Sequence, residues 1–425
     1  MSRFLVDSGI DWIGKIPESW NINKVKYVCK YYNGIGHENE QDYDGKYVLI
    51  NSKFISTNGN VKKYTENQLF PLFKNDICFV LSDLPSGKAL ARTYLVMENN
   101  KYTLNQRIAV LRNSDINPKF LFYFLNRNQF FLNYDDGCNQ TNLKKENVLN
   151  CPLLIPNSVE QIRIVNYLDK KCSKIDEIIK DNNREIELLE EYKINILDSA
   201  CLKGVEEHEY IKVNHYSINK IPVGWKFQNV LSTLLMPITD GPHSTPNLID
   251  NGIPFISADA IKDGKIDFSR KRGDISEEDY IEFSKKYIPK LNDIYMIKSG
   301  ATTGKVGVVE TTDKFTIWSP LAVYRSNETI IFFKYLYYLL QTNFYQEQVQ
   351  LNWSFGTQQN IGMRVLEKLK VLVPPLKEQK QIVKYIDNQF YKIDEVIEYR
   401  KQIIEKLEEY KKSLIYECVT GKREV

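Results

Sequence analysis

The chain is 425 residues long, 43% of its residues are hydrophobic, and its formal net charge at pH 7 is +3. This length predicts two or three domains, each with enough apolar residues for a core of its own. No run approaches the roughly 18 apolar residues of a membrane span. The N-terminus lacks the basic start and apolar stretch of a signal peptide. We therefore expect a soluble, cytoplasmic protein with no membrane contact.

The cysteines and histidines show no metal-ligand pattern. Seven cysteines are scattered without a Cys-x-x-Cys pair, and the four histidines have no ligand spacing. Zinc ribbons and redox dithiols are therefore disfavoured, and we expect no bound metal. The nearly neutral charge does not decide on nucleic-acid binding, because the relevant quantity is a basic stripe on one face.

The two halves of the chain repeat each other. Ile-Pro-Glu-Ser-Trp at 16–20 reappears as Ile-Pro-Val-Gly-Trp at 221–225. Asp76 and Asp293 are each followed eleven residues later by Gly-Lys. From Pro156 onward the second copy follows at a constant offset of 218 residues. Repeats on this scale decide the architecture, and they indicate that about half of the chain was duplicated.

Each copy is a mixed segment followed by one long helix. The mixed segments, 1–157 and 204–375, contain short apolar runs separated by Gly, Pro, Asn and Asp, which predicts strands joined by loops. The helices are expected at 158–203 and 376–422. The predicted fold class is thus α+β, with two mixed α/β domains separated by two long helices.

Apolar residues in both long helices recur in alternating steps of four and three, which is typical of a coiled-coil seam. The seam residues are Ile164, Leu168, Ile175, Ile179, Ile186 and Leu189 in the first helix and Ile382, Ile386, Ile393, Ile397, Ile404 and Leu407 in the second. Polar residues interrupt both seams at equivalent places, Asn182 with Arg400 and Lys193 with Lys411, where they either fix the register or face solvent. A lone helix with one apolar stripe is marginal. We expect the two to pack antiparallel and to relate the domains by a pseudo-twofold axis.

The chain resembles the specificity subunits of type I restriction-modification systems over almost its whole length. The most specific matches are the run from Asp7 to Trp20, the Pro-Pro-Leu-Lys-Glu-Gln entry at 374–379, Ile-Val-Lys-Tyr-Ile-Asp at 382–387 and Val-Thr-Gly-Lys at 419–422. The resemblance implies two target-recognition domains, each reading one half of a bipartite double-stranded DNA target, with the helices setting the spacer.

The resemblance also implies partners that perform the chemistry. Two methyltransferase (M) subunits would dock on this chain, and motor-nuclease restriction (R) subunits would complete the complex. S-adenosylmethionine, ATP and Mg would then be bound by those partners, with no cofactor on this chain. Asp-Gly-Pro-His-Ser-Thr-Pro at 240–246 looks like a segment of many target-recognition domains of the family. The first domain shows no equivalent, so we expect the two domains to read different sequences.

Candidate DNA-contacting residues follow from the chemistry of phosphate and base contacts. Lys and Arg suit phosphates and guanine, while Asn and Gln suit adenine. The candidates lie in loops 82–88 and 105–107 of the first domain and in loops 240–245 and 298–305 of the second. They are Ser82, Gly87, Lys88, Asn105, Gln106, Arg107, Asp240, Gly241, His243, Ser244, Thr245, Lys298, Ser299, Thr302, Thr303 and Lys305.

Several candidates also have an ordinary structural explanation. Gly87 suits a hairpin turn, and the loop at 299–304 suits either a phosphate contact or a flexible turn. His243, between Gly-Pro and Ser-Thr-Pro, indicates an exposed loop more than a buried histidine. Gln140 and Asn142 recur as Gln358 and Asn360, and they either contact DNA or brace the helix.

Two further repeated pairs are expected to be structural. Trp20 and Trp225 are predicted to be packing anchors. Glu160 and Glu378 lie near helix starts, where a carboxylate suits the helix dipole, although a docking role for the methyltransferase stays open.

Catalytic motifs are absent. The sequence has no [DN]-P-P-[FYW] motif and no Gly-rich methyl-donor loop, so we expect no methylation by this chain alone. The run 300–306 departs from a P-loop in its glycine spacing and in the residue after Lys305. Two alternatives stay open. One is a specificity subunit whose partner fuses methyltransferase and nuclease, and the other is a coiled-coil adaptor that binds proteins and no DNA.

Overall fold

The computed structural model describes residues 3–37, 41–42, 44–84, 87–113, 115–137, 139–355 and 359–425. Contacts divide the chain into two compact units. Unit 1 contains Met1–Asn182 and Gln402–Val425, and unit 2 contains Asn183–Lys401. The two long helices, α6 (Ser158–Lys203) and α11 (Leu376–Val419), each contribute one part to each unit. The remainder of each unit is called head 1 or head 2.

Head 1 is built on two four-stranded sheets. The first has the order β10 (Thr93–Leu95), β8 (Ile77–Val80), β12 (Ile108–Asn113), β4 (Cys29–Asn33), all antiparallel. The second has the order β11 (Tyr102–Leu104), β6 (Tyr47–Ile50), β7 (Tyr64–Thr65), β5 (Gln41–Asp42), and its β11–β6 pair is parallel. The two-stranded pairs are β1 (Leu5–Asp7) with β2 (Lys15–Pro17), β3 (Asn21–Lys24) with β14 (Pro152–Ile155), and β9 (Ser82–Asp83) with β13 (Thr141–Asn142). The short helices are α1 (Val25–Val28), α2 (Ser52–Ser56), α3 (Pro118–Leu125), α4 (Gln129–Leu132) and α5 (Lys145–Leu149).

Head 2 is built on a six-stranded and a three-stranded sheet. The first has the order β18 (Thr239–Asp240), β26 (Leu321–Tyr324), β23 (Ile294–Ile297), β24 (Val306–Val308), β21 (Lys265–Ile266), β20 (Ile261–Lys262). The second has the order β22 (Gly273–Ile275), β19 (Ile253–Ile256), β25 (Thr316–Ile317), with β19–β25 parallel. The pairs are β15 (Tyr210–Lys212) with β16 (Lys220–Pro222), β17 (Lys226–Asn229) with β29 (Lys370–Val373), and β27 (Ser354–Phe355) with β28 (Gln359–Asn360). The helices are α7 (Glu277–Ser284), α8 (Phe333–Leu339), α9 (Asn343–Asn352) and α10 (Met363–Leu366), with 3-10 turns η1 (Val230–Thr233), η2 (Ala258–Ala260) and η3 (Phe268–Arg270).

The central strand of each head is buried on both faces. In β8, Ile77 and Phe79 face a core shared with α3 and the long helices, while Cys78 and Val80 face a second core under the other sheet. This is the period of two that strand geometry imposes. In head 2, β23 divides its residues between two cores in the same way. A continuous apolar run therefore marks the strand around which each head is built.

The duplication extends to the elements themselves. The β3–β14 pair has its counterpart in β17–β29, the parallel β6–β11 pair in β19–β25, and α3 in α8, all in the same chain order. The predicted α+β class with two long, packed helices is confirmed. No helix within the described ranges is long and apolar enough to cross a membrane.

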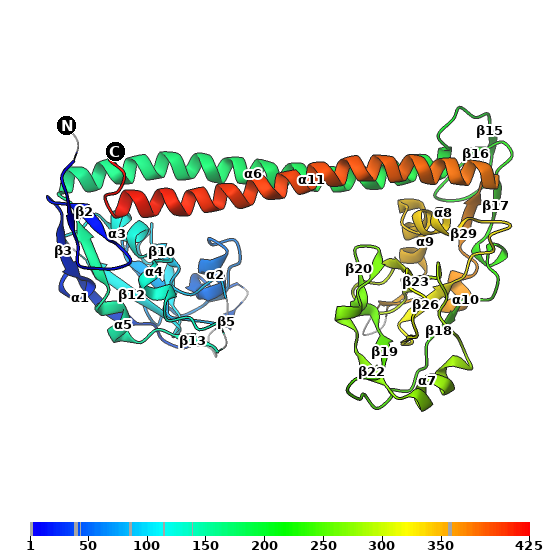
Figure 1. The fold of residues 1–425 in the computed structure, drawn as a ribbon, viewed down its shortest axis with the longest axis horizontal. Coiled ribbons are helices and arrows are strands. Elements are labelled where there is room, and N and C mark those ends of the chain that lie inside the picture. The colour runs from blue at the N-terminus through cyan, green and yellow to red at the C-terminus, as the bar shows by residue number, and fades with distance from the viewer. Residues whose placement is uncertain are drawn as a thin grey trace. The chain divides into compact units, whose positions relative to one another are not determined.

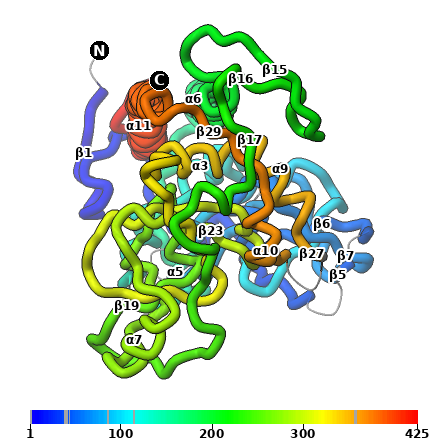
Figure 2. The backbone as a smooth tube through the Cα atoms, turned by 90° about the vertical axis from the view of Figure 1, so that its right-hand side faces the viewer, coloured from blue at the N-terminus to red at the C-terminus, as the bar shows by residue number. Residues whose placement is uncertain are grey.

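Within each unit the long helices lie side by side and antiparallel (Figures 1 and 2). In unit 2, Glu185 pairs with Arg400 at 2.7 Å and Lys193 with Asp394 at 2.8 Å, so rising numbers on α6 meet falling numbers on α11. The seam residues are buried near the heads and half-buried further along: Ile164, Leu168, Ile175, Ile382, Ile386, Ile393 and Ile397 are buried, and Ile179, Ile186, Leu189, Ile404 and Leu407 are intermediate.

The polar interruptions of the seam are engaged and do not simply face solvent. Lys411 pairs with Asp176 at 2.6 Å in unit 1, and Lys193 with Asp394 in unit 2 is its counterpart in the repeat. Asn182 is buried, and its Nδ2 donates to Ile178 O at 2.7 Å. The two ion pairs join α6 to α11 and favour the interpretation that the lysine positions fix the register, whereas the Asn182 bond lies within α6.

Candidate nucleic-acid interface

Four loops of head 1 meet beside the ends of its central strands. They are residues 33–37, 82–88, 105–107 and 140–142, of which 85 and 86 lie outside the described residues. Ile35 N donates to Leu104 O at 3.0 Å. Leu81 N donates to Arg107 O at 3.2 Å, and Leu143 N donates to Leu81 O at 2.8 Å. We call these four loops loop face 1, and every candidate named in the first domain lies on it.

Head 2 repeats this arrangement in loop face 2. Its loops are residues 240–245, 298–305, 318–320 and 359–361, and residue 358 lies outside the described residues. Lys298 N donates to Pro320 O at 2.8 Å, and Ile361 N donates to Lys298 O at 2.9 Å. Lys298 thus makes the same two main-chain bonds as Leu81 in head 1. The structure brings together residues that the sequence presented as separate candidates.

Head 1 does contain a counterpart of the 240–246 segment, and the prediction that it lacks one is wrong. Asn33 pairs with Ala109 of β12 just as Asp240 pairs with Ala322 of β26. A glycine follows in both heads. The two segments therefore leave equivalent strands at equivalent points.

Close backbone packing explains why the glycine persists while its neighbours differ. A Cβ on Gly34 would clash with the backbone of Asn105, and one on Gly241 would clash with the backbone of Ile317. After the glycine the side chains of the two segments differ, so their structural equivalence cannot be recognised from the sequence alone. Different side chains on one backbone frame agree with the expectation that the heads read different sequences.

The histidines of these two segments differ in exposure. His37 is buried, its Nε2 2.9 Å from Thr103 Oγ1 and its Nδ1 2.7 Å from Ile35 O. The side chain of His243 is 70% exposed, and its Nε2 is 3.3 Å from Asp240 Oδ2. His243 therefore lies on an exposed loop, and only this histidine is accessible to a ligand.

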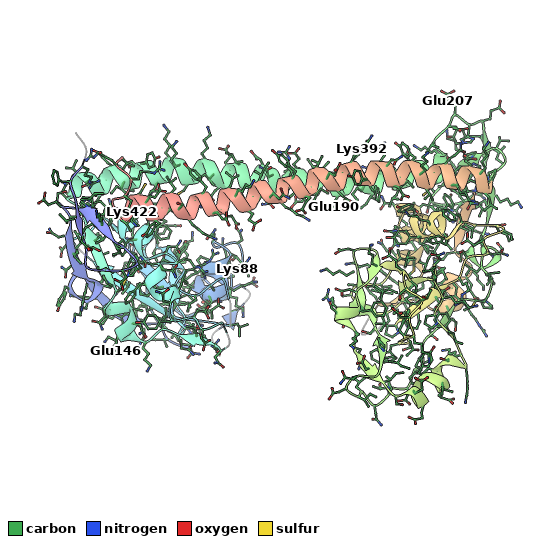
Figure 3. The ribbon with its side chains drawn as sticks, viewed as in Figure 1. Lys88, Glu146, Glu190, Glu207, Lys392 and Lys422 are labelled. Carbon is green, nitrogen blue, oxygen red and sulfur yellow. The ribbon has the colours of Figure 1, made fainter. Side chains whose placement is uncertain are left out.

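Loop 82–88 exposes Lys88, buries Ser82 and leaves Gly87 partly buried. Lys88 is exposed at the edge of head 1 (Figure 3). Ser82 is buried, and its Oγ accepts from Gln140 Nε2 at 2.8 Å, which supports the bracing interpretation of Gln140. A Cβ on Gly87 would clash with the carboxylate of Asp83, so packing alone accounts for that glycine.

A partly buried arginine holds the base of the same loop. Arg127 Nη1 donates to Gly87 O at 3.3 Å and to Leu90 O at 3.4 Å, and burial lowers the pKa of Arg127. Asp83 Oδ2 accepts from Ala89 N at 2.6 Å. Lys88 and Arg107, on the neighbouring loop, are both exposed. Neither cation has an acidic partner within the described part of the chain.

Asp240 is fully buried and lies at the centre of a charge cluster in head 2. Lys286 Nζ binds its Oδ1 and donates to Gly241 O at 3.0 Å, and Lys298 Nζ is 3.3 Å from Oδ2. Asp240 cannot itself reach DNA. Its carboxylate instead holds two lysines and His243 together beneath loop face 2. Sequence reasoning missed Lys286, because its position 46 residues further along carries no motif.

The candidate loop 298–305 is an ordered turn between β23 and β24. Thr303 Oγ1 donates to Gly300 O at 2.7 Å, and Gly304 N donates to Ile297 O at 2.8 Å. The hydroxyl of Thr303 is thereby engaged within the turn. Thr302 and Lys305 are exposed, and Ser299 is intermediate.

The remaining candidates are distributed as follows over the two faces. Gln106, Arg107, Ser244 and Thr245 are exposed, Asn105 is intermediate and Gly241 is buried. Asn142 and Asn360 are both exposed, and each lies in a strand that crosses its loop face.

Two repeated carboxylates, those of Asp76 and Asp293, form ion pairs within their own heads and lie away from the loop faces. Asp76 accepts from Arg112 Nε at 2.9 Å, and Asp293 accepts from Arg325 Nε at 2.7 Å. Both carboxylates are buried at the start of the central strand, whereas the loop faces form at its end. The repeated Asp-Ile pairs therefore mark the framework.

The entry to each long helix is fixed by a second repeated contact. Trp20 Nε1 donates to Glu160 Oε2 at 2.9 Å, and Trp225 Nε1 donates to Glu378 Oε2 at 3.0 Å. Both indoles are buried, as expected of packing anchors. The two glutamates lie in the first turn of their helices, but their carboxylates accept hydrogen bonds from the indoles. At the start of α6 it is the side chain of Asn157 that accepts from a backbone N–H, that of Glu160.

The neighbouring glutamines complete the joint between head and helix. Gln161 Oε1 accepts from Asn117 N at 2.8 Å, and Gln379 Oε1 accepts from Phe332 N at 2.7 Å, at the starts of α3 and α8. Among the described residues, no group of three or more His, Cys, Asp or Glu side chains could hold a metal ion. The two loop faces present exposed cations, amides and hydroxyls around an ordered loop frame.

Comparisons with known proteins agree with this architecture. The family model described as the type I restriction modification DNA specificity domain matches residues 17–188 and 243–409. The chain is 23% identical to the type I restriction enzyme MjaVIII specificity subunit of Methanocaldococcus jannaschii over 423 residues, which is 96% of this chain and 94% of the relative. It is 21% identical to the EcoBI specificity subunit of Escherichia coli over 409 residues, covering 93% and 84%.

A solved structure shares the fold over nearly the whole length. It comes from work on complex assembly and conformational transition of a type I restriction-modification system, and it matches with a TM-score of 0.68 and 19% identity over 96% of this chain and 99% of that one. The family match covers well over half of the sequence in two segments, one in each copy of the repeat. The chain therefore belongs to the type I restriction-modification DNA specificity family and is the DNA specificity subunit of such a system.

Proposed function

We propose that the chain reads a bipartite double-stranded DNA target, one half through loop face 1 and the other through loop face 2. The observation that carries this proposal is the double occurrence of one loop frame with different side chains on it. One frame explains a common way of docking on DNA, and the different side chains explain two different half-sites.

The chemistry of the faces fits contacts to both phosphates and bases. Lys88 and Arg107 on loop face 1 and Lys305 on loop face 2 are exposed cations suited to phosphate oxygens. Asn142 and Asn360 carry exposed amides, which match the donor and acceptor edge of adenine. The phosphate contacts would supply affinity and the amides discrimination.

The partners and cofactors belong to the same proposal. Two M subunits would dock on this chain and bind S-adenosylmethionine, and R subunits would bind ATP and Mg. The complex would act in the cytoplasm, where its DNA substrate is found. This chain would contribute recognition and a scaffold, and its domains would be 1–157 and 204–375 as target-recognition domains with helices at 158–203 and 376–422.

Co-expression with the cognate methyltransferase in a host lacking other DNA methylation tests the proposal. Sequencing that detects modified bases should give one motif of two short defined halves with an undefined spacer. Methylation without sequence preference would contradict the proposal. Absence of salt-dependent DNA binding by the assembled complex would instead support a protein-binding adaptor.

Two matched variants sharpen this test. Lys305→Ala should weaken methylation at all sites to a similar degree and leave the motif unchanged, because a phosphate contact carries no sequence information. Lys290→Ala is the control, since Lys290 is also exposed but precedes β23, at the end of the strand away from loop face 2.

A further inference from the structure

One arginine of head 2 is stacked on an aromatic residue of loop face 2. The guanidinium carbon of Arg272 is 3.7 Å from the ring centroid of Trp318. Arg272 is exposed and lies directly before β22, whereas Trp318 is half-buried and begins the loop 318–320. Arg272 thus joins loop face 2 from the neighbouring three-stranded sheet.

The platform under the guanidinium is firmly held. Trp318 N donates to Ile256 O at 2.8 Å, and the indole packs against Phe255 with ring centroids 6.4 Å apart. Arg272 N donates to Phe255 O at 2.9 Å, so backbone and side chain of Arg272 are both anchored on this one sheet. Stacking of this kind restricts the rotamers of a long side chain before any ligand binds.

The hydrogen-bonding edge of Arg272 remains available. By contrast, Arg112 donates its N–H groups to Asp76 and to a nearby carbonyl oxygen, and Arg325 donates its N–H groups to Asp293 and to a nearby carbonyl oxygen. Within the described ranges, the Arg272 side chain has no ion pair and no hydrogen bond of this kind. Stacking occupies the face of the guanidinium, while its N–H groups point outward in the plane.

We propose that Arg272, held on Trp318, reads a guanine in the half-site of head 2. This inference rests on the proposed function of loop face 2. Guanine presents O6 and N7 as a pair of acceptors in the major groove, and a guanidinium edge matches that pair with two parallel N–H groups. A guanidinium edge can also pair with a phosphate, but only base readout carries sequence information and requires the one orientation that Trp318 imposes.

The described residues of head 1 contain no such stacked arginine beside the equivalent loop. Asn105 occupies the place of Trp318, since Asn105 N donates to Ile50 O at 3.1 Å as Trp318 N donates to Ile256 O. Asparagine has no ring on which a guanidinium could stack. Loss of the Arg272 side chain should therefore alter one half of the motif and leave the half read by head 1 unchanged.

The test maps methylation by the complete complex carrying Arg272→Ala, Arg272→Lys or the control Lys290→Ala. Arg272→Ala should reduce the preference for guanine at one position of one half-site by about 10- to 100-fold, while the other half keeps its sequence. Arg272→Lys should retain part of that preference, because one ammonium cannot form the paired contact. The unchanged half of the motif reports that the variant chain is folded and assembled.

Three results would overturn the inference. They are a wild-type half-site of head 2 without guanine, a uniform loss of methylation with an unchanged motif, and no effect of Arg272→Ala. In each of these a bipartite wild-type motif would still uphold the proposed function. If the wild-type complex shows no bipartite motif, both the proposed function and this inference fail.

Discussion

The Asp240 carboxylate shows what a buried charge does in this protein. It is removed from water and receives Lys286, Lys298 and His243. Burial of an isolated carboxylate would be strongly unfavourable, so the ammonium groups of Lys286 and Lys298 are needed for its burial. The cluster links loop 240–245 to loop 298–305 and to the segment after α7. Its effect is to fix the position of basic groups beneath loop face 2.

Asp240→Ala should destabilise the chain by about 2 kcal/mol, because Lys298 would lose the partner of a mostly buried charge. Urea unfolding of the purified full-length chain, followed by circular dichroism, would measure this loss. The exposed Asp250→Ala is the matched control in the same head, with an expected change under about 0.5 kcal/mol. Equal effects of the two substitutions would show that the cluster adds no stability.

The cysteines make a second prediction at the residue scale. The six cysteines within the described residues are buried. Burial raises the pKa of Cys29 to about 12, that of Cys172 to about 11 and that of Cys418 to about 12. The thiolate is the reactive form, so these thiols should be almost entirely protonated and inert at pH 8.

A thiol reagent that releases a coloured product would check this on a Cys138→Ser chain, because Cys138 lies outside the described residues. The native chain should release almost no colour at pH 8. The same chain in concentrated urea should react at all six remaining cysteines. Fast reaction of the folded chain would contradict the burial of at least one thiol.

At the scale of elements, apolar contacts and ion pairs contribute very differently to the paired helices. Leu414 of α11 is fully buried in the core of unit 1, whereas the Asp176–Lys411 pair has side chains that are 58% and 28% exposed. Exposed ion pairs stabilise by about 1 kcal/mol or less. Removal of a buried leucine costs about 2–5 kcal/mol.

Leu414→Ala should therefore destabilise unit 1 several times more than Lys411→Ala. Thermal unfolding of both variants beside the wild type would compare them. The counterpart substitution Lys193→Ala in unit 2 should match Lys411→Ala, since the two lysines occupy equivalent places in the repeat. A larger effect of the lysines than of Leu414 would mean that charge, and not the apolar seam, holds the helices together.

The elements also show which parts of the fold the sequence could predict. The long helices were predictable because their seam places Ile and Leu at alternating spacings of four and three residues, a pattern that can be recognised in the sequence. The loop frame was not. Gly34 and Gly241 are both required by a close contact with the backbone of a neighbouring segment. A single glycine among unlike neighbours, however, gives no recognisable sequence motif. Lys286 and Arg272 reach loop face 2 from other strands and loops, through contacts that only the folded sheets create.

At the scale of the whole molecule, the chain passes between its two units only within helices. The boundaries follow Asn182 in α6 and Lys401 in α11. Each head therefore carries its own sheets, cores and loop face, and contacts between the heads are not needed to build either face. Such a division predicts that the heads are exchangeable.

Exchange of residues 1–157 for the corresponding domain of another specificity subunit should change one half of the methylated motif and preserve the other. The same exchange of residues 204–375 should change the opposite half. Motif mapping of the two chimaeras in the complete complex would also assign each half to its head. A chimaera that altered both halves would show that the heads do not read independently.

The helices are expected to set the spacer between the halves. Insertion of seven residues after Asn182 in α6 and seven before Gln402 in α11 adds two turns of seam to each helix, about 10 Å in length. At 3.4 Å per base pair, the spacer should lengthen by up to about three base pairs while both halves stay unchanged. Insertion in α6 alone is the control, because it shifts the seam of one helix against the other and should abolish methylation. An unchanged spacer after the double insertion, or a change in either half, would exclude the helices as the element that measures the distance.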